Sequence, residues 1–248
     1  PADQLRYDAN GGSGTMEATE GYLDGLVDIS ANGFTAPAGY HFSGWNTASN
    51  GTGTSYAAGG KYRLTENDDV LYAQWSPNED TKYTVEHYQA NANGTYPTTP
   101  TNKETKSGTT GTTADYNPQN YSNFEYDSTA TTWQVQGSSV SSTALPIAGD
   151  GTLVIKLYYK RTTATYKVEH WKQNLEQNGY EHVTEDDETK GPGNVGSEAT
   201  FTPKDYPGFT YNTNKTTPSD KIILGDGSLV IRLYYDRDVD TAYRVEHY

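Results

Sequence analysis

The stretch from Leu153 to Trp171, LVIKLYYKRTTATYKVEHW, decides the fold of this 248-residue chain. Up to Tyr159, large apolar side chains occupy every second position, which is typical of a β-strand. A second strand pattern begins at Tyr166. Only Lys160–Thr165 lies between the two strands, and it contains no glycine or proline. We therefore expect two folded units joined by a short and fairly stiff linker.

The same phrases return along the chain. LVIRLYY occupies Leu229–Tyr235, and strand openings similar to YKVEHW occur as YTVEHY at Tyr83–Tyr88 and as YRVEHY at Tyr243–Tyr248. Strands that recur in a fixed order predict a tandem array instead of one large domain. Only 33% of the residues are hydrophobic, which also favours several small cores.

The first of these repeats is longer than the second. Tyr126 and Tyr211 are 85 positions apart, because 211 minus 126 is 85, whereas Gly149 and Gly225 are 76 apart. The first repeat therefore holds nine additional residues between Tyr126 and Gly149, and Trp133 is one of them. Each repeat reads as short strands with Asp-Gly turns at residues 150–151 and 226–227, and any helix should be short.

The composition argues against several functions. The formal net charge of -14 would repel a phosphate backbone, so we do not expect nucleic-acid binding. The chain has no cysteine, which excludes disulfides, thiolate metal sites and cysteine nucleophiles. No apolar run reaches the roughly 18 residues that a membrane span needs. We also find no phosphate loop, zinc spacing or catalytic triad order, so enzyme activity is not expected.

Residues 1–78 differ from the two repeats. Their landmarks are YDANGG at Tyr7–Gly12, GYHFSGWNT at Gly39–Thr47, NGTGTSY at Asn50–Tyr56 and LYAQW at Leu71–Trp75. In this order they resemble the Listeria-Bacteroides repeat, the internalin-type B repeat of bacterial surface proteins. The resemblance implies a small β-grasp, or ubiquitin-like, domain.

Residues 79–162 and 163–238 form the two repeats, and residues 239–248 read as a linker and the first strand of a further repeat. The YxVEHY phrase, GFTY at Gly208–Tyr211 and GDGSLVIRLYY at Gly225–Tyr235 resemble the mucin-binding-protein type repeats of Gram-positive adhesins. This resemblance again implies β-grasp-like domains. The expected fold is therefore mainly β, or α+β: three tandem small β-grasp domains in an elongated rod.

A Glu-His pair recurs in each strand opening, as Glu86-His87 and Glu169-His170. Neighbouring strand residues point to opposite faces, so an acid-base role for the pair is disfavoured. We expect both histidines to be packed, hydrogen-bonded structural residues. The acidic run at residues 185–188 lacks the pattern of a calcium loop and is expected to be a solvated face.

Two further kinds of site were considered. Asp236, Asp238 and Asp240 place alternate carboxylates at a predicted domain joint, which makes them weak candidates for binding Ca²⁺. Resemblance to Gram-positive adhesins also raises self-formed isopeptide bonds. Their candidate partners here are Lys106 with Asp127 and Lys190 with Asn212, with Glu86 or Glu169 as the acid. Ordinary surface charges are the favoured interpretation of these residues.

We expect this chain to be a stalk segment of a bacterial cell-surface adhesin, located outside the cell at the wall. In this role it spaces and presents a binding head, and its partners are neighbouring repeats of the same chain. The alternative is direct binding of a host glycoprotein or mucin-type glycan. Exposed aromatic rings suit sugar faces, and the candidates are Trp133, Tyr88 and Trp171. Inter-strand or inter-domain contacts are the favoured interpretation of these rings.

Overall fold

The computed structural model describes residues 2–65, 69–140, 145–239 and 244–246. Within these ranges regular structure consists of β-strands and one short 3₁₀ helix, η1 (Thr184–Asp186). This confirms the prediction of a mainly β protein and the expectation that any helix is short. The strands form three five-stranded sheets and one two-stranded sheet.

The chain divides into two compact units. Unit 1 comprises Pro1–Glu86, Asn102–Asn117 and Thr131–Lys156, and unit 2 comprises His87–Thr101, Pro118–Ala130 and Leu157–Tyr248. The division runs through the middle five-stranded sheet. The predicted domain ranges 1–78, 79–162 and 163–238 therefore remain predictions. We call these ranges the N-terminal segment, the first repeat and the second repeat.

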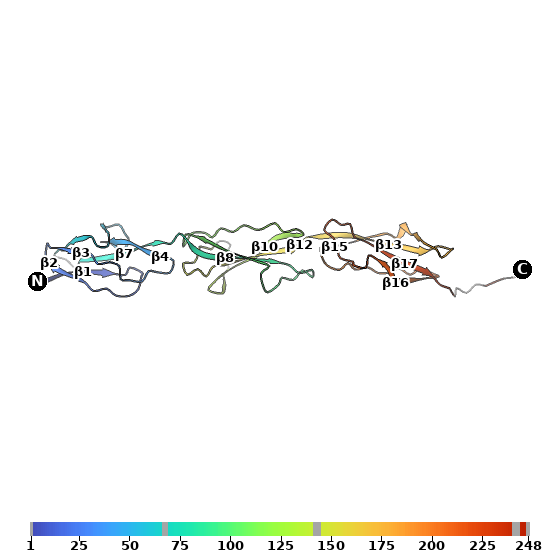
Figure 1. The fold of residues 1–248 in the computed structure, drawn as a ribbon, viewed down its shortest axis with the longest axis horizontal. Helices are drawn as coiled ribbons and strands as arrows, with labels where there is room; N and C mark the ends of the chain where they lie inside the picture. Colours follow the sequence, from blue (N-terminus) through green and yellow to red (C-terminus); the bar gives the residue numbers. More distant parts are fainter. Residues whose placement is uncertain (1, 66–68, 141–144, 240–243, 247–248) are drawn as a thin grey trace. The chain divides into compact units, whose positions relative to one another are not determined.

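The sheet of the N-terminal segment has the strand order β2-β1-β7-β4-β5, and most of its strands are labelled in Figure 1. These strands are β1 (Ala2–Asp8), β2 (Thr19–Tyr22), β4 (Tyr40–Asn46), β5 (Ser55–Tyr56) and β7 (Asp69–Pro77). A separate pair consists of β3 (Leu26–Asp28) and β6 (Lys61–Arg63). The first and last strands, β1 and β7, are parallel neighbours, with Leu5 opposite Asp69.

Trp45 is the centre of the core in this segment and is fully buried. Its ring centroid lies 5.0 Å from that of Phe42, although three positions separate the two residues. The register of β4 against β7 shifts between Phe42 and Gly44, and Gly44 has a φ of 149°. Such a β-bulge adds one residue, so both aromatic rings reach the same face.

The middle sheet has the order β11-β10-β12-β8-β9. Its strands are β8 (Thr81–Gln89), β9 (Asn102–Gly108), β10 (Phe124–Val135), β11 (Ser138–Val140) and β12 (Val154–Arg161). The additional segment of the first repeat lengthens β10 and adds β11 through a tight turn at Gln136 and Gly137, both with positive φ. Such a turn suits a two-residue hairpin.

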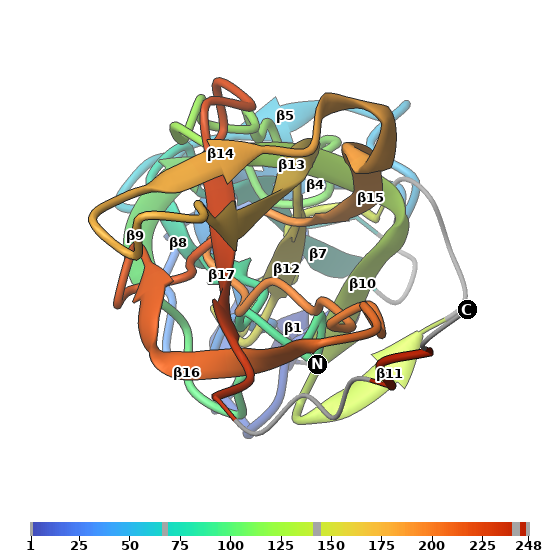
Figure 2. The ribbon, with the colours of Figure 1, turned by 90° about the vertical axis from the view of Figure 1, so that its right-hand side faces the viewer.

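The sheet of the second repeat has the order β14-β13-β17-β16, and β15 pairs with another part of β13. Its strands are β13 (Thr163–Gln173), β14 (Tyr180–His182), β15 (Glu188–Asn194), β16 (Phe209–Thr217) and β17 (Val230–Arg237). Figure 2 shows the long, curved β16 next to β17. The first and last strands are again parallel neighbours, in register from Lys167–Val230 to Lys172–Tyr235.

The alternation of side chains along β13 and β17 determines which residues of this sheet face the core. Val168, His170, Ile231 and Leu233 are fully buried, because every second residue of a strand faces the core. The predicted linker at Lys160–Thr165 is shorter than expected. Strand β12 continues to Arg161 and β13 starts at Thr163, so Thr162 alone separates them.

Candidate functional site

The structural features that repeat along the chain are the joints between successive segments. At the first joint, inside unit 1, the Asn78 N–H donates to the Gly39 carbonyl at 2.8 Å. The Asn78 carbonyl in turn accepts the Thr110 N–H at 2.9 Å. Next to it, the hydroxyls of Thr81 and Thr110 lie 2.7 Å apart and are buried. One linker residue thus binds the segment before it and the repeat after it.

The second joint, inside unit 2, has the same pattern. The Thr162 N–H donates to the Asn123 carbonyl at 3.0 Å, and the Thr162 carbonyl accepts the Val195 N–H at 2.9 Å. Asn123 has a positive φ of 66° and Gly39 one of 79°, so the two acceptors share a backbone conformation. The two joints therefore use equivalent main-chain bonds.

Arg161 adds side-chain contacts to the second joint. Its Nε donates to the Ala90 carbonyl at 3.1 Å, and its Nη1 donates to the Val195 carbonyl at 2.9 Å. The guanidinium also lies over the Phe124 ring, 4.8 Å from its centroid. The fixed fork of a guanidinium suits such divergent acceptors better than a lysine does. A single side chain therefore links the first repeat to the second.

The first glycine of each GDG turn lies at a joint. A Cβ atom on Gly149 would lie 2.1 Å from the Ala38 carbonyl oxygen, and one on Gly225 would lie 2.3 Å from the Asn123 side-chain oxygen. Glycine permits this approach without displacing a neighbour, and at position 149 that neighbour is main chain. The sequence predicted the Asp-Gly turns, and Gly151 and Gly227 have the positive φ of turn residues. The sequence did not show that the first glycine of each GDG turn faces another segment. The recurrence of that glycine at positions 149 and 225 was the available signal.

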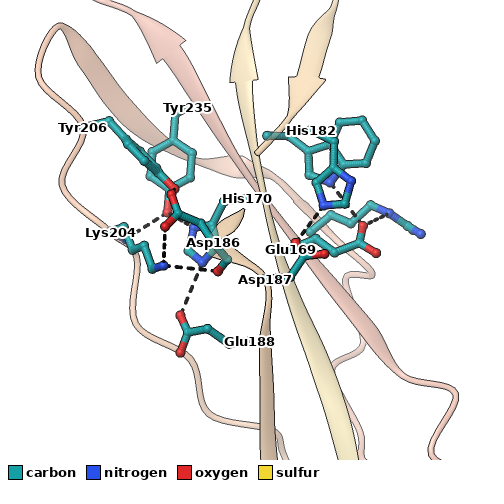
Figure 3. A network of polar contacts seen from close by, with 11 residues as sticks. Glu169, His170, His182, Asp186, Asp187, Glu188, Lys204, Tyr206 and Tyr235 are labelled. Carbon is teal, nitrogen blue, oxygen red and sulfur yellow. Dashed lines mark hydrogen bonds and ion pairs between the residues drawn. The ribbon is translucent and has the colours of Figure 1, made fainter. Parts of the chain in front are cut away.

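The second repeat contains a polar network around His170, drawn in Figure 3. The ring is fully buried, with Nδ1 2.9 Å from the Tyr235 hydroxyl and Nε2 3.4 Å from Glu188. Asp186 accepts the Lys204 ammonium at 2.8 Å and the Tyr206 hydroxyl at 2.5 Å. The Asp186 and Glu188 side chains are 26% and 27% exposed, so these two carboxylates of the acidic run are partly solvated and also paired within the repeat.

The electrostatics of this network fit a structural role. Burial lowers the pKa of His170, against the raising effect of Glu188, so the ring is neutral near pH 7. The bond from Lys204, followed by that from Tyr206, lowers the pKa of Asp186. The bond from Lys190 lowers the pKa of Glu188. Each carboxylate is thus held in its charged form by a donor, as in a packed core.

Glu169 lies on the other face of β13, as predicted. Its Oε2 accepts Arg232 Nε at 3.0 Å and Trp171 Nε1 at 3.2 Å, and Figure 3 shows it apart from His170. In the first repeat, His87 is fully buried with Nδ1 2.7 Å from the Tyr159 hydroxyl. The expectation of packed, hydrogen-bonded histidines is confirmed for both repeats.

The aspartates proposed for Ca²⁺ are occupied by protein contacts where they are described. Asp236 accepts bonds from Asn212 at 2.6 Å and from the Tyr180 hydroxyl, and Asp238 accepts the Thr210 hydroxyl at 2.6 Å. Asp240 lies outside the described residues. Within the described part of the chain, no group of three or more His, Asp or Glu side chains could hold a metal ion.

The proposed isopeptide partners of the second repeat do not meet. Lys190 lies on β15 and Asn212 on β16, with β13 and β17 between these strands. Three strand spacings amount to about 14 Å, so this pair is not placed to form the bond, and ordinary surface charges remain the favoured interpretation. In the first repeat, Lys106 lies on β9, and the Asp127 carboxylate accepts the Thr129 hydroxyl at 2.6 Å.

The aromatic candidates for ligand binding are less exposed than expected. Trp133 is 7% exposed and packs edge-on against Tyr116, which lies outside the additional hairpin. Tyr88 is 4% exposed and stacks on Tyr158. Trp171 is partly buried and stacks on His182, with ring centroids 4.5 Å apart. Trp133 and Tyr88 therefore make the packing contacts that the favoured interpretation expects, and neither ring is exposed for a ligand.

Two proteins of Evansella cellulosilytica are similar over short stretches. One, named "Putative membrane protein", is 36% identical over 76 residues, which is 30% of this chain and 11% of that protein. The other, named "Putative Gly-rich membrane protein", is 40% identical over 70 residues, or 27% of this chain and 8% of that protein.

The chain thus spans about a tenth of the length of these curated relatives. Among the described residues, no helix is long and apolar enough to cross a membrane. The family comparison supports the resemblance given by the YDANGG, GW and LYAQW landmarks. Residues 4–74, which carry the β1–β7 sheet, match the family model of the Listeria-Bacteroides repeat domain.

Proposed function

We propose that this chain is a non-enzymatic stalk segment of a bacterial cell-surface protein, which spaces a binding head from the cell wall and carries tensile load. The match of residues 4–74 to the Listeria-Bacteroides repeat domain supports a surface repeat protein. The relatives named as membrane proteins are consistent with an envelope location. Small tandem β-grasp-like domains are part of this proposal.

The observation that carries the proposal is the pairing of first and last strands. In the second repeat, β13 and β17 are parallel and share six residue pairs, from Lys167–Val230 to Lys172–Tyr235. In the N-terminal segment, β1 and β7 pair in the same way from Leu5–Asp69 to Asp8–Tyr72. The chain therefore enters and leaves each of these sheets through adjacent strands.

This arrangement determines how a pulling force acts. Parallel neighbours start at the same end of a sheet, so the start of β13 and the end of β17 lie at opposite ends of their ladder. Tension on these two points acts along the strands and loads the ladder hydrogen bonds together. When a ladder is instead pulled apart from one end, its hydrogen bonds break one after another, and this requires far less force. A segment built in this way is suited to a stalk.

Single-molecule pulling on the second repeat tests the proposal. Because the chain has no cysteine, handles can be attached to introduced cysteines. Handles at Lys167 and Arg237 apply shear to the β13–β17 ladder. Handles at Lys167 and Val230, which are register partners, separate the same ladder from one end and provide the matched control. We expect the shear geometry to resist several-fold more force.

Equal and low forces in the two geometries would contradict the load-bearing role.

The alternative function, direct glycan binding, is less well supported because Trp133 and Tyr88 are buried. Mucin or glycan-array binding by the folded chain, lost on Trp171→Ala with the fold intact, would favour the alternative.

A further inference from the structure

The C-terminal end of the second repeat repeats half of each joint. The Asp238 N–H donates to the Gly208 carbonyl at 3.0 Å, as Asn78 does to Gly39 and Thr162 does to Asn123. Gly208 has a positive φ of 78°, which matches the other two acceptors. Asp238 therefore occupies the position of the linker residue in the two joints already described.

Arg237 repeats the arrangement of Arg161. Its guanidinium lies over the Phe209 ring, 5.0 Å from the centroid, and its Nε donates to the Asn174 carbonyl at 3.1 Å. Arg161 lies in the same way over Phe124, and it reaches the next repeat with Nη1. The contacts that hold Arg161 against its own repeat are thus present again for Arg237 at the end of the second repeat.

Among the described residues, none packs against Gly208 at this half-joint. A Cβ atom on Gly208 would meet no heavy atom of the described residues within 4 Å, whereas one on Gly39 would lie 2.3 Å from Gly149 Cα across the first joint. Two apolar side chains close to the half-joint in sequence are exposed: Leu175, next to Asn174, at 75% and Val239, next to Asp238, at 85%. These two side chains add apolar area near the half-joint, whereas the repeated polar contacts of Asp238 and Arg237 indicate which surface a neighbour would use.

We propose that this end is a docking surface for a further repeat of the same kind, held by a bond from its amide to the Asp238 carbonyl and by Arg237. This inference deepens the proposed stalk function and rests on it. The sequence supports the choice of occupant, because residues 238–243 read DVDTAY and residues 78–83 read NEDTKY. The aspartate, threonine and tyrosine coincide, so a repeat that opens at Tyr243 has the linker of the first joint.

The existing joint also shows which groups the incoming repeat contributes. The second repeat contacts the first repeat through three residues. Val195 uses its N–H and its carbonyl, and the Asn194 side-chain amide lies 3.3 Å from the Ala92 carbonyl. Gly225 approaches the Asn123 side chain closely. A copy of the second repeat therefore carries the groups that the half-joint needs. This makes such a copy a suitable probe.

The test extends the full chain, with residues 1–242 followed by a copy of residues 166–239. Spin labels on introduced cysteines report each joint by pulsed electron resonance. Ser128 and Glu198, both exposed, report the existing joint, and the equivalent positions Thr213 and the copy's Glu198 report the new one. We expect the two distance distributions to have the same mean and the same narrow width.

A broad distribution at the new joint, with the existing joint narrow in the same chain, would overturn the proposal. The variant Asp238→Pro removes the N–H that donates to Gly208, and we expect it to broaden only the new joint. An unchanged narrow distribution would overturn the role of Asp238. If the unextended chain associates end to end through this surface, detected by light scattering and lost on Leu175→Lys, the occupant is a second chain and the proposal fails. The pulling experiment measures only the β13–β17 ladder of the second repeat. Failure of the docking proposal can therefore be distinguished from failure of the stalk proposal.

Discussion

The hydroxyl of Tyr235 lies 2.9 Å from Nδ1 of His170, and the two rings stack with centroids 5.8 Å apart. Tyr159 and His87 form the same pair at 2.7 Å and 5.7 Å in the first repeat. The recurring EH and YY phrases are therefore halves of one buried contact between the first and last strands. The motif that looks most like acid-base chemistry in the sequence joins two strands of a core.

Removing the hydroxyl tests this contact. Tyr235→Phe removes the hydroxyl that is the partner of His170 Nδ1. The same change removes the acceptor of the Lys204 main-chain N–H, which donates to this oxygen at 2.9 Å. An unsatisfied buried polar group costs about 1–3 kcal/mol, and we expect a loss of that size in urea unfolding. Tyr234→Phe is the matched control, because that ring faces the other side of β17. Equal effects of the two variants would contradict the contact's importance.

The second repeat should become less stable in mild acid. Burial lowers the pKa of His170 in the folded state, so the unfolded state takes up its proton first as the pH falls below about 6.5. The stability contributed by the neutral ring is complete above that pH and declines below it. The lowered pKa values of Asp186 and Glu188 add a further loss below about pH 4.

Hydrogen exchange of the β13 and β17 amides between about pH 8 and pH 5, corrected for intrinsic rates, measures this effect locally. The variant His170→Gln removes the titrating group. We expect it to be less stable than the parent at neutral pH but to show a smaller change between the two conditions. The same pH dependence in the variant and the parent would assign the effect to other groups.

The two GDG glycines should tolerate alanine differently. The Cβ of Gly149→Ala would meet the Ala38 main chain at 2.1 Å, whereas that of Gly225→Ala would meet the Asn123 side chain. A side chain can rotate away and a main chain cannot, so Gly149→Ala should weaken its joint more. Faster exchange of the Asn78 and Thr110 amides would report this.

The control for this comparison is the double variant Gly225→Ala with Asn123→Gly. Glycine suits the φ of 66° at position 123, and it removes the clashing side chain. We expect the double variant to restore any protection of the Val195 amide that Gly225→Ala loses. No difference between the two single variants would mean that the joints adjust without cost.

The sequence predicted what alternation and turn chemistry control. It placed Val168 and His170 inward and Glu169 outward, because a strand has a period of two. It failed where tertiary partners decide. Trp133 was a candidate for an exposed binding ring because it lies in additional residues, yet it is 7% exposed and packs against Tyr116.

The joints were missed for a related reason. The linker was read as Lys160–Thr165 from polarity alone, whereas strand pairing continues on both sides of Thr162. Sequence patterns report which face of a strand is buried, but they do not show which carbonyl Arg161 will reach. The recurrence of Phe124 and Arg161 as Phe209 and Arg237 was a usable signal, since two repeats that keep such a pair keep its contact.

Arg161 offers the sharpest test of how the second joint is held. Arg161→Lys keeps the charge, but one ammonium cannot bond both the Ala90 and the Val195 carbonyls across the distance that the guanidinium spans. We expect a broader distance distribution between labels at Ser128 and Glu198 and little change in the unfolding of either repeat. Gly196→Ala attacks the same contact from the other side, because its Cβ would lie 2.7 Å from Arg161 Nη1, although the φ of 86° at Gly196 adds strain of its own. If Arg161→Lys leaves the distribution as narrow as in the parent chain, the main-chain bonds of Thr162 alone hold the joint, and the guanidinium has no part in its stiffness.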